Sequence, residues 1–598
     1  MAAAIYRRMT QTFPSRSPAD ATPLDPPIPA PGSPDELRAF AELQRGLAPM
    51  FSRVFSNAKA SRTVVVIPSM SLDHEELAKL RGASRYEERF LCLLMLLQLP
   101  ATRVVYITSE PVAPSIVNYY LGLVRGVGPR DARDRLTMLT CDDPSAAPLT
   151  EKILARHRLV ARIRGLIDDP RSSHLTCFTA TALERTLAVR LGIPLYGCDP
   201  ALWHLGTKSG SRDVFHGAGV LTPPGYEHLR GEDEVIRALV DLKREHPAVR
   251  RAVIKLEEGF SGEGNAIFSY DGAPAGQDLA LWVRASLPKQ ARFVAPGERW
   301  DTYRDKLARM GGIVEAFVVG AEVRSPSVQC RIDPSGATQI ISTHDQVLGG
   351  ASGQVYLGCK FPAELSCCRG LHAAAQRVTD VLASEGVVGR FGIDFVSTRV
   401  HNEWRHYAIE INIRKGGTTH PFLTLQLLTD GTYDSAPGGG LFRTKAGRPC
   451  FYVASDNLCD PAYTALTPQC VISAASRSAL AFDPNAERGV IFHLLGALQD
   501  YGKLGAVCIG RTREDAQNLF ANTIAMLKRE AAQKGARRMP RASRAADWIA
   551  GWSPPNHRLV PRCNAAASNR IYYKVVVACH LPPRSSRCAS PVRSFSWW

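Results

Sequence analysis

The chain has 598 residues, 45% of them apolar and 22% charged, so it is too long for one hydrophobic core, and we expect about three or four domains. Its longest apolar run, at 90–97, is far shorter than the roughly 20 residues of a bilayer-spanning helix, and no signal-peptide core follows the N-terminus, so we expect a cytoplasmic protein without a membrane partner. The formal charge of +17 is uneven: +10 of it falls after residue 535, which argues against nucleic-acid binding by the body of the protein.

The first 60 residues are expected to form a disordered, proline-rich leader. Eight of the 24 residues at 11–34 are proline, which disfavours a regular helix and removes donors for a sheet. Order is predicted to begin near Arg62, where the β-branched run TVVVIPS at 63–69 is typical of a strand buried on both faces of a parallel sheet. A helix at 86–99 and a second buried strand at 103–109 complete a parallel α/β unit.

This pattern continues with a helix at 150–167, a strand at 174–180 and a helix that ends on Gly192. Residues 61–200 are therefore predicted to form a Rossmann-like domain. The first strand is followed by IPSMSLD instead of G-x-G-x-x-G, so the sequence gives no support for dinucleotide binding.

Three further parts follow along the chain. Residues 201–430 alternate strands and helices with glycine-rich turns and contain most of the motifs. Residues 431–535 are predicted to form a small C-terminal domain with an amphipathic helix at 513–532. Residues 536–598 show neither helical nor strand periodicity and are predicted to be a basic, disordered tail.

A glycine-rich loop follows a short apolar strand in AVIKLEEGFSGEGNAIF, at 252–268. Lys255 lies near the end of the strand, and Gly259, Gly262 and Gly264 follow it. Glycines let backbone N–H groups approach an anion, and a lysine adds a positive charge suited to phosphate. From these residues alone, phosphate binding and a simple hairpin beside a solvated lysine are equally plausible. A P-loop is excluded at 496–505, where the glycine spacing is wrong and leucine follows the lysine.

Carboxylates occupy two apolar strands predicted to form a hairpin. Asp394 lies in GRFGIDFV, and Glu410, Asn412 and Arg414 alternate with Ile409, Ile411 and Ile413 in the next strand. Residues two apart on a strand point the same way, so the polar groups should converge while the isoleucines pack underneath. Two carboxylates and an amide oxygen suit Mg²⁺.

Five motifs in this order resemble the ATP-grasp ligases, and residues 61–530 are similar to the pheganomycin-type peptide ligases within that family. In chain order the motifs are GTKSGSRDVFHGAGVLTPPG, VIKLEEGFSGEGN, VEAFVVGAEV, GIDF and EINIR. The resemblance implies a pre-ATP-grasp domain of Rossmann type, an ATP-grasp α+β core and a small C-terminal domain. It implies ATP contacts from Lys208, Lys255 and Glu315, with Gly262 and Gly264 in the loop. It also implies a magnesium site at Asp394, Glu410 and Asn412, and contact of Arg414 with the transferred phosphate.

Further site residues are predicted from their places beside these motifs. The loop at 259–264 is a candidate lid that keeps water from the reaction. Backbone N–H groups of Gly416 and Gly417, with the hydroxyls of Thr418 and Thr419, are candidates to hold a substrate carboxylate. His420 is a candidate proton acceptor, with a structural histidine as the alternative, and Arg324 is expected near the phosphates or the carboxylate.

The expected activity is ATP- and Mg²⁺-dependent joining of a small-molecule or peptide carboxylate to an amine, with Mn²⁺ as a possible substitute metal. Two alternatives remain at this point: an ATP-grasp phosphotransferase without an amine acceptor, and a non-enzymatic protein whose basic tail binds anions or nucleic acid. The sequence identifies neither the acid nor the amine, and it leaves open whether the chain forms a homo-oligomer.

Overall fold

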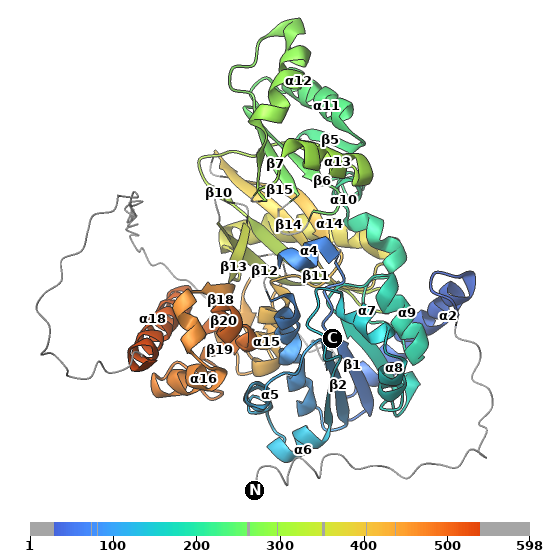
Figure 1. Cartoon of the computed structure of the whole chain (residues 1–598), viewed down its shortest axis with the longest axis vertical. Coiled ribbons are helices and arrows are strands. Elements are labelled where there is room, and N and C mark those ends of the chain that lie inside the picture. Colours follow the sequence, from blue (N-terminus) through green and yellow to red (C-terminus); the bar gives the residue numbers. More distant parts are fainter. Residues whose placement is uncertain are drawn as a thin grey trace, which may run out of the picture.

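The computed structural model describes residues 29–538 except 73, 81, 260–263, 296, 350–352, 354, 402 and 437. In this part the chain forms sheets of four, five and eleven strands. Figure 1 shows the five-stranded module at one end of the molecule, the largest sheet in the middle, and the first domain beside the C-terminal helices at the other end. Within the described ranges, no helix combines the length and the apolar character needed to cross a bilayer.

The first domain is built on a parallel sheet with the strand order β3-β2-β1-β4. The strands are β1 (Arg62–Ile67), β2 (Thr102–Thr108), β3 (Leu136–Thr140) and β4 (Ser173–Cys177). All six residues of β1 are buried, as a central parallel strand requires. The Rossmann-like prediction is confirmed, although β3 was not predicted because its five residues mix apolar and polar side chains.

Helices surround this sheet: η2 (Ala83–Gln98), α5 (Pro114–Leu121), α7 (Leu149–Leu154), α8 (His157–Arg164) and α9 (Ala182–Leu191). The single helix predicted at 150–167 is two helices, because Arg156 leaves the helical region at φ −113°. Its guanidinium donates to the Lys152 carbonyl (2.9 Å) and to Asp143 (3.0 Å), which stabilises the end of α7. As predicted, α9 ends at Gly192, which adopts a left-handed φ of 70°.

The leader was predicted to be disordered up to residue 60, and this is wrong for residues 34–55. They form α2 (Pro34–Arg45), α3 (Leu47–Met50) and η1 (Phe51–Phe55). Pro34 stands in the first turn, where its missing N–H is tolerated, and the Ser33 hydroxyl accepts from the Glu36 N–H. The Gln44 side chain exchanges two hydrogen bonds with the Leu195 backbone, so these helices are docked on the first domain. Residues 1–28 lie outside the described residues.

The five-stranded sheet is a separate module with its own apolar core and the strand order β5-β9-β6-β7-β8. Its strands are β5 (Gly225–Leu229), β6 (Arg251–Leu256), β7 (Asn265–Ser269), β8 (Arg292–Phe293) and β9 (Gly312–Ala316). Its helices are α11 (Glu232–Glu245), α12 (Leu279–Gln290) and α13 (Trp300–Met310), and α10 (Lys208–Gly217) precedes it.

The largest sheet crosses the boundary predicted between residues 430 and 431. Its first six strands are β10 (Val323–Arg324), β11 (Pro326–Ile332), β12 (Thr338–Gly349), β13 (Val355–Phe361), β14 (Gly389–Val400) and β15 (Glu403–Asn412). The C-terminal part adds β16 (Thr432–Tyr433), β17 (Phe442–Arg443), β18 (Pro449–Cys459), β19 (Gly489–His493) and β20 (Lys503–Gly510). Strand β18 pairs directly with β13, so the C-terminal segment continues the sheet of the catalytic core instead of forming a detached domain.

Helices α14 (Leu365–Ser384), α15 (Thr419–Thr429) and α18 (Arg513–Arg538) pack with this sheet, and α16 (Pro468–Arg477) packs on α18 and on α5 of the first domain. Helix α18 contains the predicted amphipathic helix and extends it to residue 538, so the predicted disordered tail, 536–598, is wrong for residues 536–538. Residues 539–598 lie outside the described residues.

We expect Phe361 to be essential to the joint between β13 and β18. Its ring is buried and stacks on Tyr452 of the facing strand, with 4.7 Å between ring centroids. Phe361→Ala should lower the free energy of unfolding by about 3–5 kcal/mol through lost burial and an unfilled cavity. Urea unfolding measures this change. Leu281→Ala, at a side chain that is 72% exposed, should change stability by less than about 0.5 kcal/mol, and equal effects of the two substitutions would contradict the assignment.

Candidate active site

A cavity of about 490 Å³ lies where the first domain, the five-stranded module and the largest sheet meet. Its wall includes Lys255 from β6, the β14–β15 residues Asp394 and Glu410, Arg89 from η2 and Asp456 from β18. Segments more than 350 residues apart in the chain therefore contribute to one site.

The predicted carboxylate pair is brought together by the β14–β15 hairpin. Asp394 and Glu410 are directly opposite each other on the antiparallel strands. Asn412 donates from Nδ2 to one oxygen of Asp394 (3.0 Å), and Gln346 of β12 donates from Nε2 to the other (2.8 Å). The pair is thus held at fixed positions on the cavity wall.

A β-bulge changes the predicted face of one isoleucine. The register shifts so that Phe395 pairs with Ala408, which leaves Ile409 as an extra residue between the two pairs. Ile411 and Ile413 are buried beneath the site, as strict alternation predicts. Ile409 lines the cavity beside Glu410, so the prediction that all three isoleucines pack underneath is wrong for this residue.

Lys208 forms an ion pair with Glu410 instead of lining the cavity. It begins α10, and its Nζ lies 2.6 Å from Glu410 Oε2. Burial acts to raise the pKa of Glu410, but Lys208, with Lys255 and Arg414, outweighs it and holds the pKa at about 2. Burial and the neighbouring Glu410 charge raise the pKa of Asp394 to about 6. The two carboxylates are therefore in unlike electrostatic environments.

Lys255 lines the cavity, whereas its predicted companion Glu315 lies behind it. Lys255 Nζ is 2.5 Å from Glu315 Oε1, and Arg212 Nη1 is 3.5 Å from the other oxygen. Glu315 is 3% exposed on β9, between β5 and β6, which places it under the wall of the cavity. In the described structure Glu315 therefore contacts Lys255, which faces the cavity, and Arg212.

The glycine loop is described only at its ends. Gly262 and most of the candidate lid lie outside the described residues. Gly264 accepts hydrogen bonds at its carbonyl from the Leu256 N–H (3.0 Å) and the Tyr303 hydroxyl (2.9 Å). A Cβ on Gly264 would lie 2.8 Å from the Gly259 Cα, so glycine is required where the two strands of the hairpin meet.

Of the five predicted substrate residues, three line the cavity before α15 and two point into the core from the start of this helix. Gly416, Gly417 and Thr418 line the cavity just before the helix begins. Thr419 turns inward, where its hydroxyl donates to Gln329 (3.1 Å) and accepts from the Gly416 N–H (2.9 Å). His420 is 1% exposed and contacts Asp456 behind the wall. Direct substrate contact is therefore wrong for Thr419 and His420, because the helix directs both into the core.

The two predicted arginines also differ. Arg414 lines the cavity, and Glu410 and Asp394 oppose the lowering of its guanidinium pKa by burial. Arg324 pairs with Glu322 (3.0 Å) and Asp345 (3.5 Å) and is not part of the described wall. Its neighbours Ser325 and Ser327 do line the cavity, and alternation along the strand directs Arg324 to the other side, so its contact with the phosphates or the carboxylate stays a prediction that the described wall does not support.

Many of the wall residues were not predicted, among them Arg89 and Phe178 of the first domain and Asp456 and Lys503 of the C-terminal segment. Of these four, only Arg89 carried a signal in the sequence. With Glu87 and Glu88 it directly precedes the apolar run FLCLLMLL, where a buried charge needs a partner.

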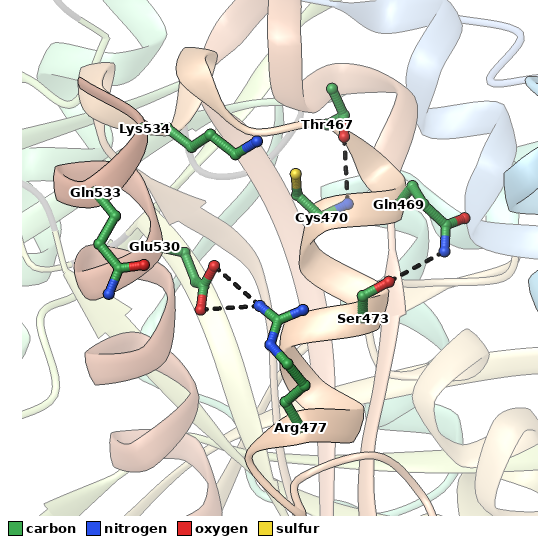
Figure 2. Close-up of a pocket in the computed structure, with 8 residues that line it drawn as sticks. All are labelled: Thr467, Gln469, Cys470, Ser473, Arg477, Glu530, Gln533 and Lys534. Carbon is green, nitrogen blue, oxygen red and sulfur yellow. Dashed lines mark hydrogen bonds and ion pairs between the residues drawn. The ribbon is translucent and has the colours of Figure 1, made fainter. Parts of the chain in front are cut away.

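A second hollow, of about 520 Å³, lies between α16 and α18 (Figure 2). Within it Arg477 forms an ion pair with Glu530 at 3.2 Å. The Cys470 pKa is lowered by a hydrogen bond from Thr467, with a further contribution from Lys534. None of the predicted site residues lines this hollow, so we assign the chemistry to the other cavity.

The chain was compared with known proteins. A family model described as IQCH-like, ATP-grasp matches residues 200–271 and 283–436, and the PGM1 C-terminal domain model matches residues 471–522. The L-propargylglycine–L-glutamate ligase of Streptantibioticus cattleyicolor is 32% identical over 462 residues, which cover 76% of this chain and 91% of that protein.

Two more distant similarities were found. IQ motif-containing protein H of Danio rerio is 24% identical over 550 residues, which cover 83% of this chain and 51% of that protein. A crystal structure of biotin carboxylase from Campylobacter jejuni aligns with a TM-score of 0.48 and 13% identity, covering 80% of this chain and 96% of that one.

The chain belongs to the ATP-grasp ligases. Within them it is an ATP-dependent carboxylate–amine ligase, as predicted. The comparisons favour neither the phosphotransferase nor the non-enzymatic alternative.

We expect Glu315 to act on the nucleotide through Lys255. Glu315→Gln removes the charge that holds the lysine, so ADP should bind about tenfold more weakly, a loss of about 1.4 kcal/mol. Isothermal titration calorimetry with ADP measures this. Glu298→Gln is the matched control, because Glu298 forms the same kind of pair with Lys306 (2.5 Å) in the same module but not at the cavity. Unchanged ADP affinity in Glu315→Gln would contradict this role.

Proposed function

We propose that the chain activates the carboxylate of an amino acid or peptide as an acyl phosphate and joins it to the amine of a second amino acid. The observation that supports this most is the convergence of two opposed carboxylates with Lys255 and Arg414 on one cavity wall. A relative whose name gives two amino acids as its substrates supports the substrate class.

The reaction needs activation because a carboxylate is a poor electrophile. The γ-phosphoryl group of ATP is transferred to a carboxylate oxygen, and ADP leaves. The amine nitrogen then attacks the acyl carbon, the C–N bond forms, and the C–O bond to phosphate breaks. The ammonium form of the amine loses two protons overall. Phosphoryl transfer of this kind depends mostly on positioning and on compensation of charge.

A divalent metal fits the residues present. Asp394 and Glu410 place two carboxylates opposite each other on paired strands. Burial and the Glu410 charge raise the pKa of Asp394, and a bound cation would relieve the repulsion between the two carboxylates. With Asn412 they would hold Mg²⁺, and Mn²⁺ is an expected substitute because it accepts the same oxygen ligands. Bound there, the metal would neutralise charge on the phosphate oxygens of ATP.

The cations have separate tasks. Lys255 faces the cavity and would contact the ATP phosphates, and Arg414 would meet the charge that develops on the transferred group. Lys208 is held by Glu410 at 2.6 Å, so we assign it to orienting that carboxylate instead of contacting phosphate directly.

The substrate carboxylate has a backbone site before α15. Gly416 and Gly417 line the cavity at the N-terminal end of this helix, where the helix dipole favours an anion. The Gly416 N–H already donates to the Thr419 hydroxyl (2.9 Å), so we assign the carboxylate to the Gly417 N–H. A Cβ on Gly417 would lie 2.8 Å from the Tyr356 ring, so the backbone lies against that ring because no side chain intervenes. Thr418 adds a hydroxyl on the same wall.

We expect Glu410→Gln to reduce Mg²⁺-dependent ADP formation at least about a hundredfold, or about 2.7 kcal/mol in transition-state stabilisation. The substitution preserves shape and removes the charge shared by Lys208 and the metal. Coupled measurement of ADP release across Mg²⁺ and Mn²⁺ concentrations tests this, with thermal unfolding to verify the fold. Glu403→Gln, at an exposed residue of the same strand, is the control. Near-normal turnover of Glu410→Gln would remove the metal assignment.

Hydroxylamine should trap the activated acid. When ATP, Mg²⁺ and an accepted acid are present without an amine substrate, we expect one acyl hydroxamate for each ADP released, because the neutral nucleophile intercepts the acyl phosphate. Mass spectrometry of the hydroxamate beside the ADP assay measures both products. ADP release that requires the amine and yields no hydroxamate with any accepted acid would contradict the acyl phosphate.

A further inference from the structure

We infer that Asp456, Arg89 and Lys503 form the subsite for the amine substrate and bind it as a zwitterionic α-amino acid. Asp456 receives the ammonium group, and Arg89 with Lys503 receives the carboxylate. This inference rests on the proposed function and adds a recognition site for its second substrate.

Asp456 presents a fixed negative charge to the cavity. Its Oδ1 lies 2.7 Å from His493 Nε2 and 3.1 Å from His420 Nε2, and its Oδ2 lies 3.4 Å from Arg89 Nη1. The side chain is 8% exposed, yet it is part of the cavity wall. Burial acts to raise the pKa of Asp456, but its bonds with the two imidazoles outweigh this and keep it ionised. A buried anion that opens onto a substrate cavity is suited to a cationic group.

Arg89, the ion-pair partner of Asp456, and Lys503 both lie close to the ring of Tyr86. Lys503 Nζ donates to the Tyr86 hydroxyl (2.5 Å), and the Lys503 and Arg89 cations lie 4.9 and 4.8 Å from the Tyr86 ring centroid. All of these residues line the cavity. One anion faces two cations, so the set complements an ammonium and a carboxylate on the same small molecule.

The subsite lies next to the place of phosphoryl transfer. The Arg89 and Arg414 guanidinium carbons lie 4.4 and 5.9 Å from the centroid of the Phe178 ring, which also lines the cavity. Arg89 of the subsite and Arg414, which would meet the transferred group, therefore both lie close to the same ring. An ammonium bound at Asp456 would be close to the acyl group that Arg414 helps to activate.

The three facing atoms of His420, His493 and Asp456 could also be read as a metal site, since they lie within 2.7–3.1 Å of one another. A metal on both Nε2 atoms would place a proton on each Nδ1. Both Nδ1 atoms are buried and lack a hydrogen-bond partner in the described structure, whereas metal-bound histidines normally donate this proton. Donation from each Nε2 to Asp456 leaves an acceptor nitrogen, instead of an N–H donor, unpartnered on each ring, so the arrangement favours a supported carboxylate.

The test compares an amino-acid acceptor with hydroxylamine in Asp456→Asn. Loss of a charge-assisted contact should raise the KM for the amino acid about tenfold or more and lower the ratio of amide to hydroxamate formation by a similar factor. Calorimetric binding of the amino acid should weaken in parallel. Asp500→Asn is the matched control, because Asp500 pairs with Arg85 (3.3 Å) in the same part of the chain but does not line the cavity.

Lys503→Met tests the carboxylate half separately. The wild-type enzyme should prefer the amino acid over its carboxamide as acceptor, and Lys503→Met should reduce this preference about tenfold. Retained preference would overturn the assignment of Lys503.

Three results would overturn the subsite. The first is a KM change in Asp456→Asn no larger than in Asp500→Asn, and the second is an equal loss of amide and hydroxamate formation. The third is a stoichiometric transition metal, detected by elemental analysis of the purified protein, that is lost in His493→Asn. Failure of the proposed function is distinguishable, because wild-type enzyme would then form neither ADP nor hydroxamate with any acid.

Discussion

The site depends on two carboxylates that a β-hairpin places directly opposite each other. Asp394 and Glu410 would repel each other in this partly buried place, and neighbouring groups both outside and within the hairpin compensate them. Lys208 reaches Glu410 from α10, and the amides of Gln346 and Asn412 donate to Asp394. The negative charge is thereby kept but only partly neutralised, which is what a site for a divalent cation and a polyphosphate requires.

The cavity is lined by residues from two parts of the chain that have separate apolar cores. Lys255 belongs to the five-stranded module with its separate core, whereas Asp394 and Glu410 belong to the largest sheet. The ion pairs that cross between these cores, such as Arg212 of α10 with Glu315 of β9 (3.5 Å), are therefore contacts that nucleotide binding would strengthen or rearrange. Two parts with separate cores can move relative to each other more easily than two parts of a single rigid core.

The sequence predicted the parts of the site that are local and missed those that depend on packing. Alternation along one strand was sufficient for Glu410, Asn412 and Arg414, since a strand fixes the direction of its own side chains. It failed at Ile409, where a bulge breaks the alternation, and at Thr419 and His420, where a helix begins. Asp456 carried no signal, because its role depends on partners 36 and 37 residues away and on a helix of the first domain.

Helix η2 contains three successive buried charged residues whose partners cannot be identified from sequence motifs alone. Its successive buried charges Glu87, Glu88 and Arg89 each have a partner in a different segment. Glu87 accepts from the Ser109 backbone and hydroxyl at 2.6 Å, and Glu88 accepts from the Gly496 N–H at 2.9 Å.

A Cβ on Gly496 would collide with the Glu88 carboxylate, so the glycine that begins the P-loop-like stretch at 496–505 is needed for this close approach and not for phosphate. Arg89 completes the series by reaching Asp456 across the cavity wall. The Glu87 contact with Ser109 lies within the first domain, whereas the Glu88–Gly496 and Arg89–Asp456 contacts hold this domain against the C-terminal segment. Because unpaired buried charges are strongly unfavourable, these contacts also stabilise η2. The position of the proposed amine subsite is therefore set by the packing of these two segments, which is why no single stretch of sequence contains it.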